Sequence, residues 1–479
     1  MAARALVGRL VSADRVPTSA AIAAGAAVLA LGSALAFQLA RKAVGVGFSS
    51  DTYSYLVWAR RAVQEGELGH TPYDYTAPKP LEMLMATIGE VLGAPVAFFG
   101  TWAILSYVAA VIAASGLAWR LGGTLAAVTA GALALILPAL VLQGYAADST
   151  VPYAACVVGA AALSPLRRVP ASCLLGVAGL LRPEAWGLAG LHAVLTWRWS
   201  TVRERTVAIA SALAPPAVWA TFDWIATGDA LYGARAVERF GVLGVPVQDV
   251  PALVERVAPS VLGWPLVALG LVAFLAGLVR RPGDPAVVFP LAIVAGLVLE
   301  LQLEYIGAQT IERYGLVLFL FFPVGAGVVL ASVPGRARLP AVVAGVALCI
   351  WSVADELRGV RDLHERRGRA ATELERGMAG AARRAVANGT LLATERQWQG
   401  ATALYGRVPR ERVVPVEEVG RNEDPEAVGA FLVIAARQEL RASRGPTPLD
   451  GLEPDRRSRR WRLYVSAGAG SEAPAGRRG

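Results

Sequence analysis

Residues 97–118 read AFFGTWAILSYVAAVIAASGLA, a run without one charged side chain. A helix of about 20 apolar residues spans the hydrocarbon core of a bilayer. The chain has 479 residues, of which 55% are hydrophobic and 17% are charged, and its mean hydropathy is +0.48. Soluble domains carry about 25% charged residues. Because similar apolar runs recur with short charged breaks between them, the sequence predicts a polytopic α-helical membrane protein.

The apolar runs predict about eleven transmembrane helices. We place two short helices on either side of Pro183, because a single span there would move the arginines that follow it to the other side of the membrane. The runs lie at residues 18–40, 97–118, 121–143, 150–164, 169–181, 184–197, 206–226, 258–279, 285–303, 314–333 and 338–354.

Arginines fall in alternate breaks between these runs, which predicts the orientation. By the positive-inside rule, those breaks and the N-terminus are cytoplasmic, and an odd number of spans puts the C-terminal segment outside. We therefore expect a transmembrane domain over 1–354, with its first outer loop at 41–96, and an extracytoplasmic domain over 355–479. The arginines are Arg120, Arg167, Arg168, Arg198, Arg203, Arg205, Arg280, Arg281, Arg336 and Arg338.

The last quarter of the chain has the composition of a soluble α/β domain. Residues 355–388 predict an amphipathic helix, and the final ten residues a disordered tail. Between them, short apolar β-like runs alternate with loop or helix segments. These runs lie at residues 390–393, 412–416, 431–434 and 462–465.

Composition excludes several kinds of site and partner. The only lysines, Lys42 and Lys79, are not followed by Ser or Thr, so the chain has no P-loop. Its three histidines are dispersed and its three cysteines lie in apolar runs, which excludes a Cys/His zinc cluster. Residues 325–327, Gly-Ala-Gly, are typical of helix packing rather than of a nucleotide loop. The net charge of +9 is spread over loop ends and tail, which favours a membrane surface over nucleic acid.

Ionisable residues gather on the predicted outer face, where charges near hydrocarbon are costly and are candidates for function. An outer loop also needs charged residues simply to remain in water, so each of these charges can be explained without a role in function. The group comprises Asp51, Lys79, Glu82, Asp148, Arg182, Glu184, Asp229, Arg235, Glu300, Glu304, Glu312 and Arg313.

Four motifs on this face resemble, in order, those of the GT-C superfamily of membrane glycosyltransferases. This superfamily includes protein O-mannosyltransferases, lipid A aminoarabinose transferases and arabinosyltransferases. The resemblance covers about 300 residues. The chain departs from the family pattern at three positions. Thr52 stands where many members have a second acidic residue, Pro78 stands where some have a Glu, and Leu81 stands where a second proline is usual. The matching segments are Asp51 with Tyr55 and Ala59-Arg60, Lys79-Pro80-Leu81, Arg182-Pro183-Glu184 with Thr227-Gly228-Asp229, and Arg313-Tyr314.

The resemblance implies transfer of a sugar from a polyprenyl phosphate. A base must take the proton of the acceptor hydroxyl, the role expected of Asp51. Cations must hold the leaving phosphate, the role expected of Lys79, Arg182 and Arg313. Further substrate contacts are expected from Tyr53, Tyr55, Asp148 and Glu184.

Each assignment has a structural alternative. Asp51 fits an N-cap, and Lys79 a snorkelling side chain. Arg182 with Glu184 fits an ion pair that braces the hinge, and Arg313 has acidic neighbours to pair with. Asp148 fits a cap for the next helix. Tyr53 and Tyr55 fit interfacial anchors.

The expected function is that of an inverting glycosyltransferase at the outer face of a bacterial plasma membrane. Its partners would be a polyprenyl-phosphate sugar, membrane lipids and an envelope glycan, lipid or protein acceptor, with no nucleic acid. The sequence identifies no cofactor and leaves a divalent metal open. Two alternatives remain, an envelope lipid or polysaccharide transporter or flippase, and a catalytically degenerate GT-C-like scaffold.

Overall fold

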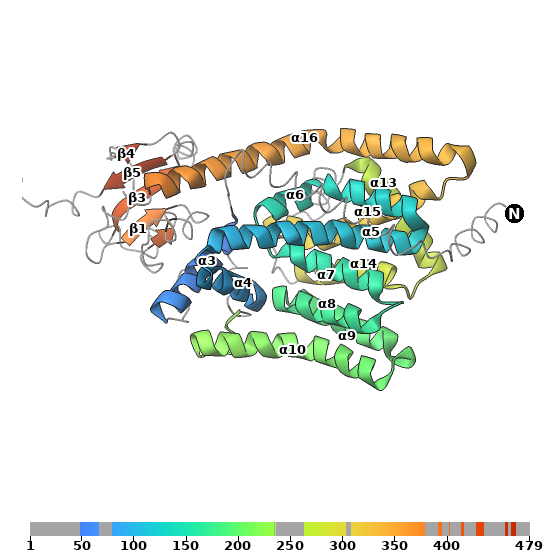
Figure 1. Ribbon diagram of the computed structural model, residues 1–479, viewed down its shortest axis with the longest axis horizontal. Coiled ribbons are helices and arrows are strands. Elements are labelled where there is room, and N and C mark those ends of the chain that lie inside the picture. The colour runs from blue at the N-terminus through green and yellow to red at the C-terminus, as the bar shows by residue number, and fades with distance from the viewer. Residues whose placement is uncertain are drawn as a thin grey trace, which may run out of the picture. The chain divides into compact units, whose positions relative to one another are not determined.

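The computed structural model describes the helical part of the chain and the strands near its end (Figure 1). The first expected span, residues 18–40, lies outside the described residues. The described residues are 48–66, 79–233, 235, 263–302, 308–378, 391–394, 402, 413–415, 428–434, 456–457 and 461–465.

The chain divides into two compact units. The first unit comprises Met1–Ala40, Ala77–Met85 and Phe98–Asp362. The second unit comprises Arg41–Thr76, Ala86–Ala97 and Leu363–Gly479. Each unit is described by itself below.

The helices of the first unit follow the predicted runs closely. The Arg182–Pro183 break separates two short helices, as the sequence predicts. The helices are α5 (Pro95–Leu135), α6 (Pro138–Tyr145), α7 (Thr150–Leu163), α8 (Arg168–Leu181), α9 (Glu184–Thr196), α10 (Val202–Thr227), α13 (Trp264–Arg280), α14 (Pro285–Gln302), α15 (Ala308–Ala331) and α16 (Arg338–Glu373).

Fewer helices than predicted are long enough to cross a membrane unaided. Among the described residues, α5 and the stretch Gly335–Glu373 are long and apolar enough to do so. The chain bends by 113° between α13 and the first part of α14, and the two would add a third span if they cross the membrane as one broken helix. Helices α7 and α8 are apolar but have 14 residues each, about 21 Å at 1.5 Å per residue. The predicted count of about eleven spans is therefore not confirmed.

Helix α5 contains the predicted run 97–118 and the first part of the predicted run 121–143. Gly123 has a φ of +81° and a ψ of −167°, which breaks the helical backbone inside α5. Such a backbone conformation suits glycine because it has no Cβ. The prediction of one span over 121–143 is wrong, because its residues form the segment after Gly123, which ends at Leu135, and most of α6, which begins at Pro138.

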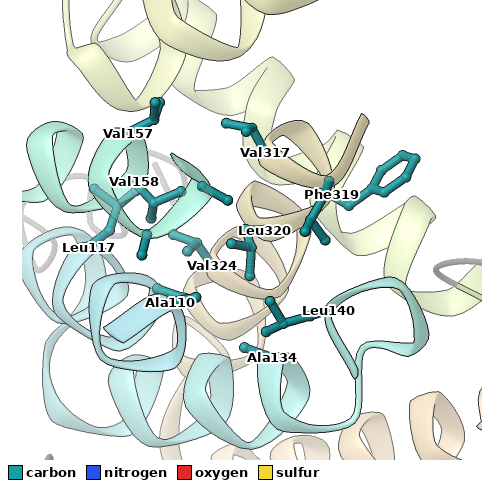
Figure 2. Close-up of a cluster of buried hydrophobic side chains, with 14 of the residues drawn as sticks. Ala110, Leu117, Ala134, Leu140, Val157, Val158, Val317, Phe319, Leu320 and Val324 are labelled. Atoms are coloured by element: carbon teal, nitrogen blue, oxygen red, sulfur yellow. The ribbon is translucent and has the colours of Figure 1, made fainter. Parts of the chain in front are cut away.

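Small and branched apolar side chains fill the core of the first unit (Figure 2). They come from both segments of α5 and from α6, α7 and α15 (Ala110, Leu117, Ala134, Leu140, Val157, Val158, Val317, Leu320 and Val324). Helix α7 also packs against α8, and α8 packs against α9 and α10.

The glycines of the Gly325–Gly327 segment are packing residues, as predicted. A Cβ on Gly327 would lie 2.6 Å from the carbonyl oxygen of Ala126 in α5, and one on Gly325 would lie 3.1 Å from the Cα of Gly270 in α13. The absence of these two side chains lets α15 approach both helices closely.

The second unit contains α3 (Ser50–Arg60), the π-helical turn Arg61–Glu65 and a five-stranded sheet. Its strand order is β2-β1-β3-β5-β4, with β1 parallel to β2 and β3, and β5 antiparallel to β3 and β4. The four predicted β-like runs all contain strands. The strands are β1 (Leu391–Thr394), β2 (Val413–Pro415), β3 (Val428–Ile434), β4 (Arg456–Arg457) and β5 (Trp461–Val465).

Three of the described helices have residues in both units, and one of them is α5, whose first three residues belong to the second unit. Helix α4 (Pro80–Val91) begins in the first unit and ends in the second. Helix α16 contains both the last predicted span and the start of the predicted amphipathic helix at 355–388, without a break between them. The change from apolar to polar composition therefore lies within one helix.

We predict that Gly327→Ala destabilises the first unit, because its new Cβ has to displace backbone at α5. Such overpacking costs about 1–3 kcal/mol, so the midpoint of thermal unfolding in detergent should fall. Gly116→Ala is the matched control, since a Cβ on Gly116 in α5 meets nothing within 4 Å. That variant should unfold at an equal or higher temperature. Equal midpoints for the two variants would contradict the packing role.

Candidate functional site

Charged side chains from three separate turns meet in the first unit. Lys79 precedes α4, and Asp148 precedes α7. Arg182 follows α8, and Glu184 is the first residue of α9. Asp148 is 3% exposed and Arg182 is 4% exposed. Burial of ionised groups is costly unless they are paired and hydrogen-bonded. The contacts that hold them therefore decide what the site can do.

The position of Arg182 follows from the proline after it. Continuation of α8 would require residue 183 to donate an N–H to the carbonyl of Gly179, and Pro183 has none. The indole Nε1 atoms of Trp186 and Trp219 donate to that carbonyl instead, at 3.0 and 2.9 Å. Arg182 closes the helix with an extended backbone (φ −151°, ψ 134°). The helix end is thus fixed by α9 and α10 together.

A strained turn positions Asp148. Ala147 has a φ of +53°, and it is the one residue other than glycine with positive φ in the described part of the chain. This conformation costs an L-residue about 1–2 kcal/mol. Asp148 Oδ1 then accepts hydrogen bonds from the backbone N–H of Thr150, at 2.9 Å, and from its hydroxyl. Asp148 thus binds the first residue of α7, but it is not the N-cap of that helix, which is Ser149 and has no side-chain capping hydrogen bond.

Arg182 binds the same turn. Its Nη2 donates to Thr150 Oγ1 at 2.6 Å and lies 3.7 Å from Asp148 Oδ1. Its Nη1 lies 3.6 Å from Glu184 Oε1, and its guanidinium carbon lies 5.9 Å from the centre of the Tyr153 ring. The predicted pairing of Arg182 with Glu184 is present, and Asp148 joins it.

Lys79 reaches the neighbouring residue of that turn. Its Nζ donates a 2.7 Å hydrogen bond to Ser149 Oγ. Lys79 and Arg182 therefore contact consecutive residues, Ser149 and Thr150. The structure brings together four of the predicted site residues, namely Lys79, Asp148, Arg182 and Glu184.

Glu82 belongs to the same cluster, although the family resemblance assigns it no role. It is 1% exposed, accepts a 3.5 Å hydrogen bond from Trp102 Nε1, and has no partner for Oε2 among the described residues. Burial raises the pKa of Glu82 to about 8, although nearby Lys79 and Arg182 lower it. Glu82 lies three residues after Lys79 at the start of a helix. Because residues at this spacing are neighbours on a helix, the sequence could have indicated that Glu82 lies beside Lys79.

The other predicted residues whose side chains are described belong to one helix. Asp51, Tyr53 and Tyr55 belong to α3 in the second unit, where Tyr53 and Tyr55 are buried. The N-cap of α3 is Ser49, whose Oγ accepts from Thr52 N at 3.2 Å, so the alternative that Asp51 caps this helix is wrong. Asp51 instead occupies the first turn and is half-buried.

Two further predictions concern Arg313 and a metal ion. Arg313 falls within α15, but its side chain lies outside the described residues. Among the residues that the structure describes, no group of three or more His, Cys, Asp and Glu side chains could hold a metal ion.

Two aspartates, one in α10 and one just after it, bind the turn that follows this helix. Helix α10 ends at Gly228, whose φ of +74° suits glycine. Asp229 accepts from Leu231 N at 3.0 Å and pairs with Arg235 at 2.7 Å. Asp223, near the end of α10, accepts from Gly233 N at 2.7 Å. The residue types of the Thr227–Gly228–Asp229 motif therefore have a structural explanation within the loop itself.

Solved structures share this fold. ArnT from Cupriavidus metallidurans bound to undecaprenyl phosphate superposes with a TM-score of 0.61 over 92% of this chain and 98% of its own, at 14% sequence identity. Its apo state gives a TM-score of 0.59 over 93% and 99%, also at 14% identity. The Archaeoglobus fulgidus oligosaccharyltransferase in complex with Zn and sulfate gives 0.54 over 86% and 68%, at 12% identity.

Sequence comparison adds nothing to these similarities, since no family model and no curated protein matches the chain. The chain shares the fold of ArnT and of the archaeal oligosaccharyltransferase. At these identities, the similarity concerns the fold alone.

We predict that Glu82 makes stability depend on pH. Because the pKa of Glu82 is about 8 in the folded protein, against an ordinary value of 4.5, unfolding releases a proton between those values. Stability relative to Glu82→Gln should therefore fall as the pH rises from about 5 to 8, by at most about 1.4 kcal/mol per pH unit. Thermal unfolding in detergent across this range measures it. Parallel curves for the two proteins would contradict the buried neutral carboxyl.

Proposed function

We propose that the chain is an inverting glycosyltransferase that uses a polyprenyl-phosphate sugar. The observation that carries the proposal is the cluster of Lys79, Arg182, Asp148 and Glu184 within a GT-C fold, of which Arg182 and Asp148 are buried. Two cations contact consecutive residues of one turn and can bind a phosphate together, since guanidinium and ammonium groups form charge-assisted hydrogen bonds to phosphate oxygens. ArnT, which shares the fold, has been solved with undecaprenyl phosphate bound.

The reaction would be a single displacement. Asp51 takes the proton of the acceptor hydroxyl while its oxygen attacks the anomeric carbon of the sugar. The bond from that carbon to the phosphate oxygen breaks, and its electron pair leaves with the polyprenyl phosphate. The configuration at the anomeric carbon inverts because the acceptor enters opposite to the leaving group.

The leaving group needs positive charge more than a proton. A phosphate monoester has a second pKa near about 6, so it departs largely as a dianion. Lys79 and Arg182 would hold the charge that develops on it, and Arg313 is proposed as a third cation. Asp148 and Glu184 hold the guanidinium of Arg182 in place. Preorganised donors of this kind are effective because they need no reorganisation when the charge appears.

The remaining assignments follow from the resemblance. Tyr53 and Tyr55 are proposed to line the sugar site from α3. The acceptor would be an envelope glycan, lipid or protein, and the active face would be the outer face of a bacterial plasma membrane. The domain over 355–479 would lie on the same side and bind acceptor or partner.

We predict that Asp51→Asn abolishes transfer, with a loss of at least about 10²-fold. Incorporation of labelled sugar from a polyprenyl-phosphate donor measures it. The control is Glu65→Gln, which removes a carboxylate from the exposed end of the adjoining helical turn and should keep full activity. Full activity in Asp51→Asn would exclude the base role. Movement of the lipid across the membrane without any sugar transfer would favour a transporter.

We predict that Lys79→Met weakens binding of the donor lipid. Removal of a charge-assisted contact should reduce affinity for undecaprenyl phosphate at least tenfold, measured by native mass spectrometry of the purified protein. Lys79→Arg keeps the charge and should retain most of the affinity. Equal binding by Lys79→Met and the unmodified protein would show that the phosphate lies elsewhere.

A further inference from the structure

An apolar groove lies in the first unit, between helices α13, α14 and α15. It has a volume of about 770 Å³, within the range of about 300–1,000 Å³ that is typical of small-molecule sites. Its walls are almost entirely apolar. They include Leu271, Phe274, Pro290, Val294, Phe321 and Phe322.

The groove is shaped by close helix packing and is open at its side. Gly270 of α13 leaves no room for a side chain, because a Cβ there would lie 2.3 Å from the Phe322 ring. Leu271 and Val294 on its walls are 46% and 42% exposed. Apolar side chains with this exposure, on helices rich in apolar residues, are suited to contact lipid chains rather than water.

Positive charge lies at one end of the groove. Arg280 and Arg281 line it and are exposed, and neither forms an ion pair with another described residue. The one acid in the wall, Asp284, is already bound by Arg120, whose Nη1 and Nη2 donate at 2.8 and 2.6 Å to its two oxygens. Arg281 also acts electrostatically on Asp284, but both arginines are exposed and can still bind an anion that arrives from outside.

This charged end is far from the candidate functional site. Trp102, which binds Glu82, and Arg120, which binds Asp284, lie in the same helical segment of α5, before the break at Gly123. About eighteen helical residues separate them, or about 27 Å at 1.5 Å per residue. That is close to the thickness of a hydrocarbon core, about 30 Å. The two sites therefore lie at opposite ends of the helical segment.

We propose that this groove binds an anionic diacyl phospholipid of the surrounding bilayer, with its phosphate at Arg280 and Arg281 and an acyl chain along α13 and α14. Basic pockets between membrane helices are suited to anionic headgroups, and the groove supplies the apolar length next to them. The inference does not depend on the proposed enzymatic function, since it concerns lipid binding at the other end of the helices.

Native mass spectrometry of the delipidated full chain tests the proposal. Phosphatidylglycerol should bind more tightly than phosphatidylcholine with the same acyl chains. The double variant Arg280→Gln/Arg281→Gln should lose this preference, with affinity for phosphatidylglycerol reduced about tenfold or more. The control Arg198→Gln/Arg203→Gln changes the charge equally at two exposed arginines that do not line the groove, and should bind normally.

A second variant tests the apolar wall independently of charge. Leu271→Trp adds volume at an exposed wall position and should reduce binding of both lipids. Three results would overturn the proposal: equal affinity for the two lipids in the unmodified protein, unchanged affinity in the arginine double variant, or stoichiometric displacement of phosphatidylglycerol by undecaprenyl phosphate. The last result would assign the groove to a polyprenyl lipid.

Discussion

The missing N–H of Pro183 is the constraint on which the site depends. It leaves the carbonyl of Gly179 without its helical donor, and a buried carbonyl needs one. Trp186 from α9 and Trp219 from α10 both supply an indole N–H. A Cβ on Gly179 would lie 2.8 Å from Pro215, so α8 and α10 meet closely here. The end of α8 is thereby fixed by two neighbouring helices, and Arg182 projects from that fixed end.

Much of the helix pattern could be predicted from the sequence because apolar runs and arginines mark it directly. The break at Pro183 was predictable because proline acts locally. The continuity of α16 was not, since a helix can pass from an apolar to a polar environment without changing its backbone. The number of spans was hard to predict, because the runs at 150–164 and 169–181 form helices of 14 residues, about as long as predicted, that pack on neighbours and are short for a membrane span.

The candidate site could be predicted only in part. Lys79, Asp148, Arg182 and Glu184 were indicated by charge beside apolar runs, which is a local signal. Glu82 was included among the outer-face charges but given no role, because its burial depends on Trp102 and no spacing shows which helix will cover a carboxyl. The N-cap of α3 is Ser49, two residues before Asp51, and assigned helix boundaries commonly differ by one or two residues.

Charge balance within the cluster constrains how it could receive a phosphate. Lys79 and Arg182 are offset by Asp148 and Glu184, so an arriving anion has to share the two cations with two carboxylates. A third ionised carboxyl would make that arrival less favourable still. Because burial raises the pKa of Glu82 to about 8, this side chain is largely neutral at pH 7. The burial of Glu82 therefore keeps a third negative charge out of the place where a phosphate is proposed to bind.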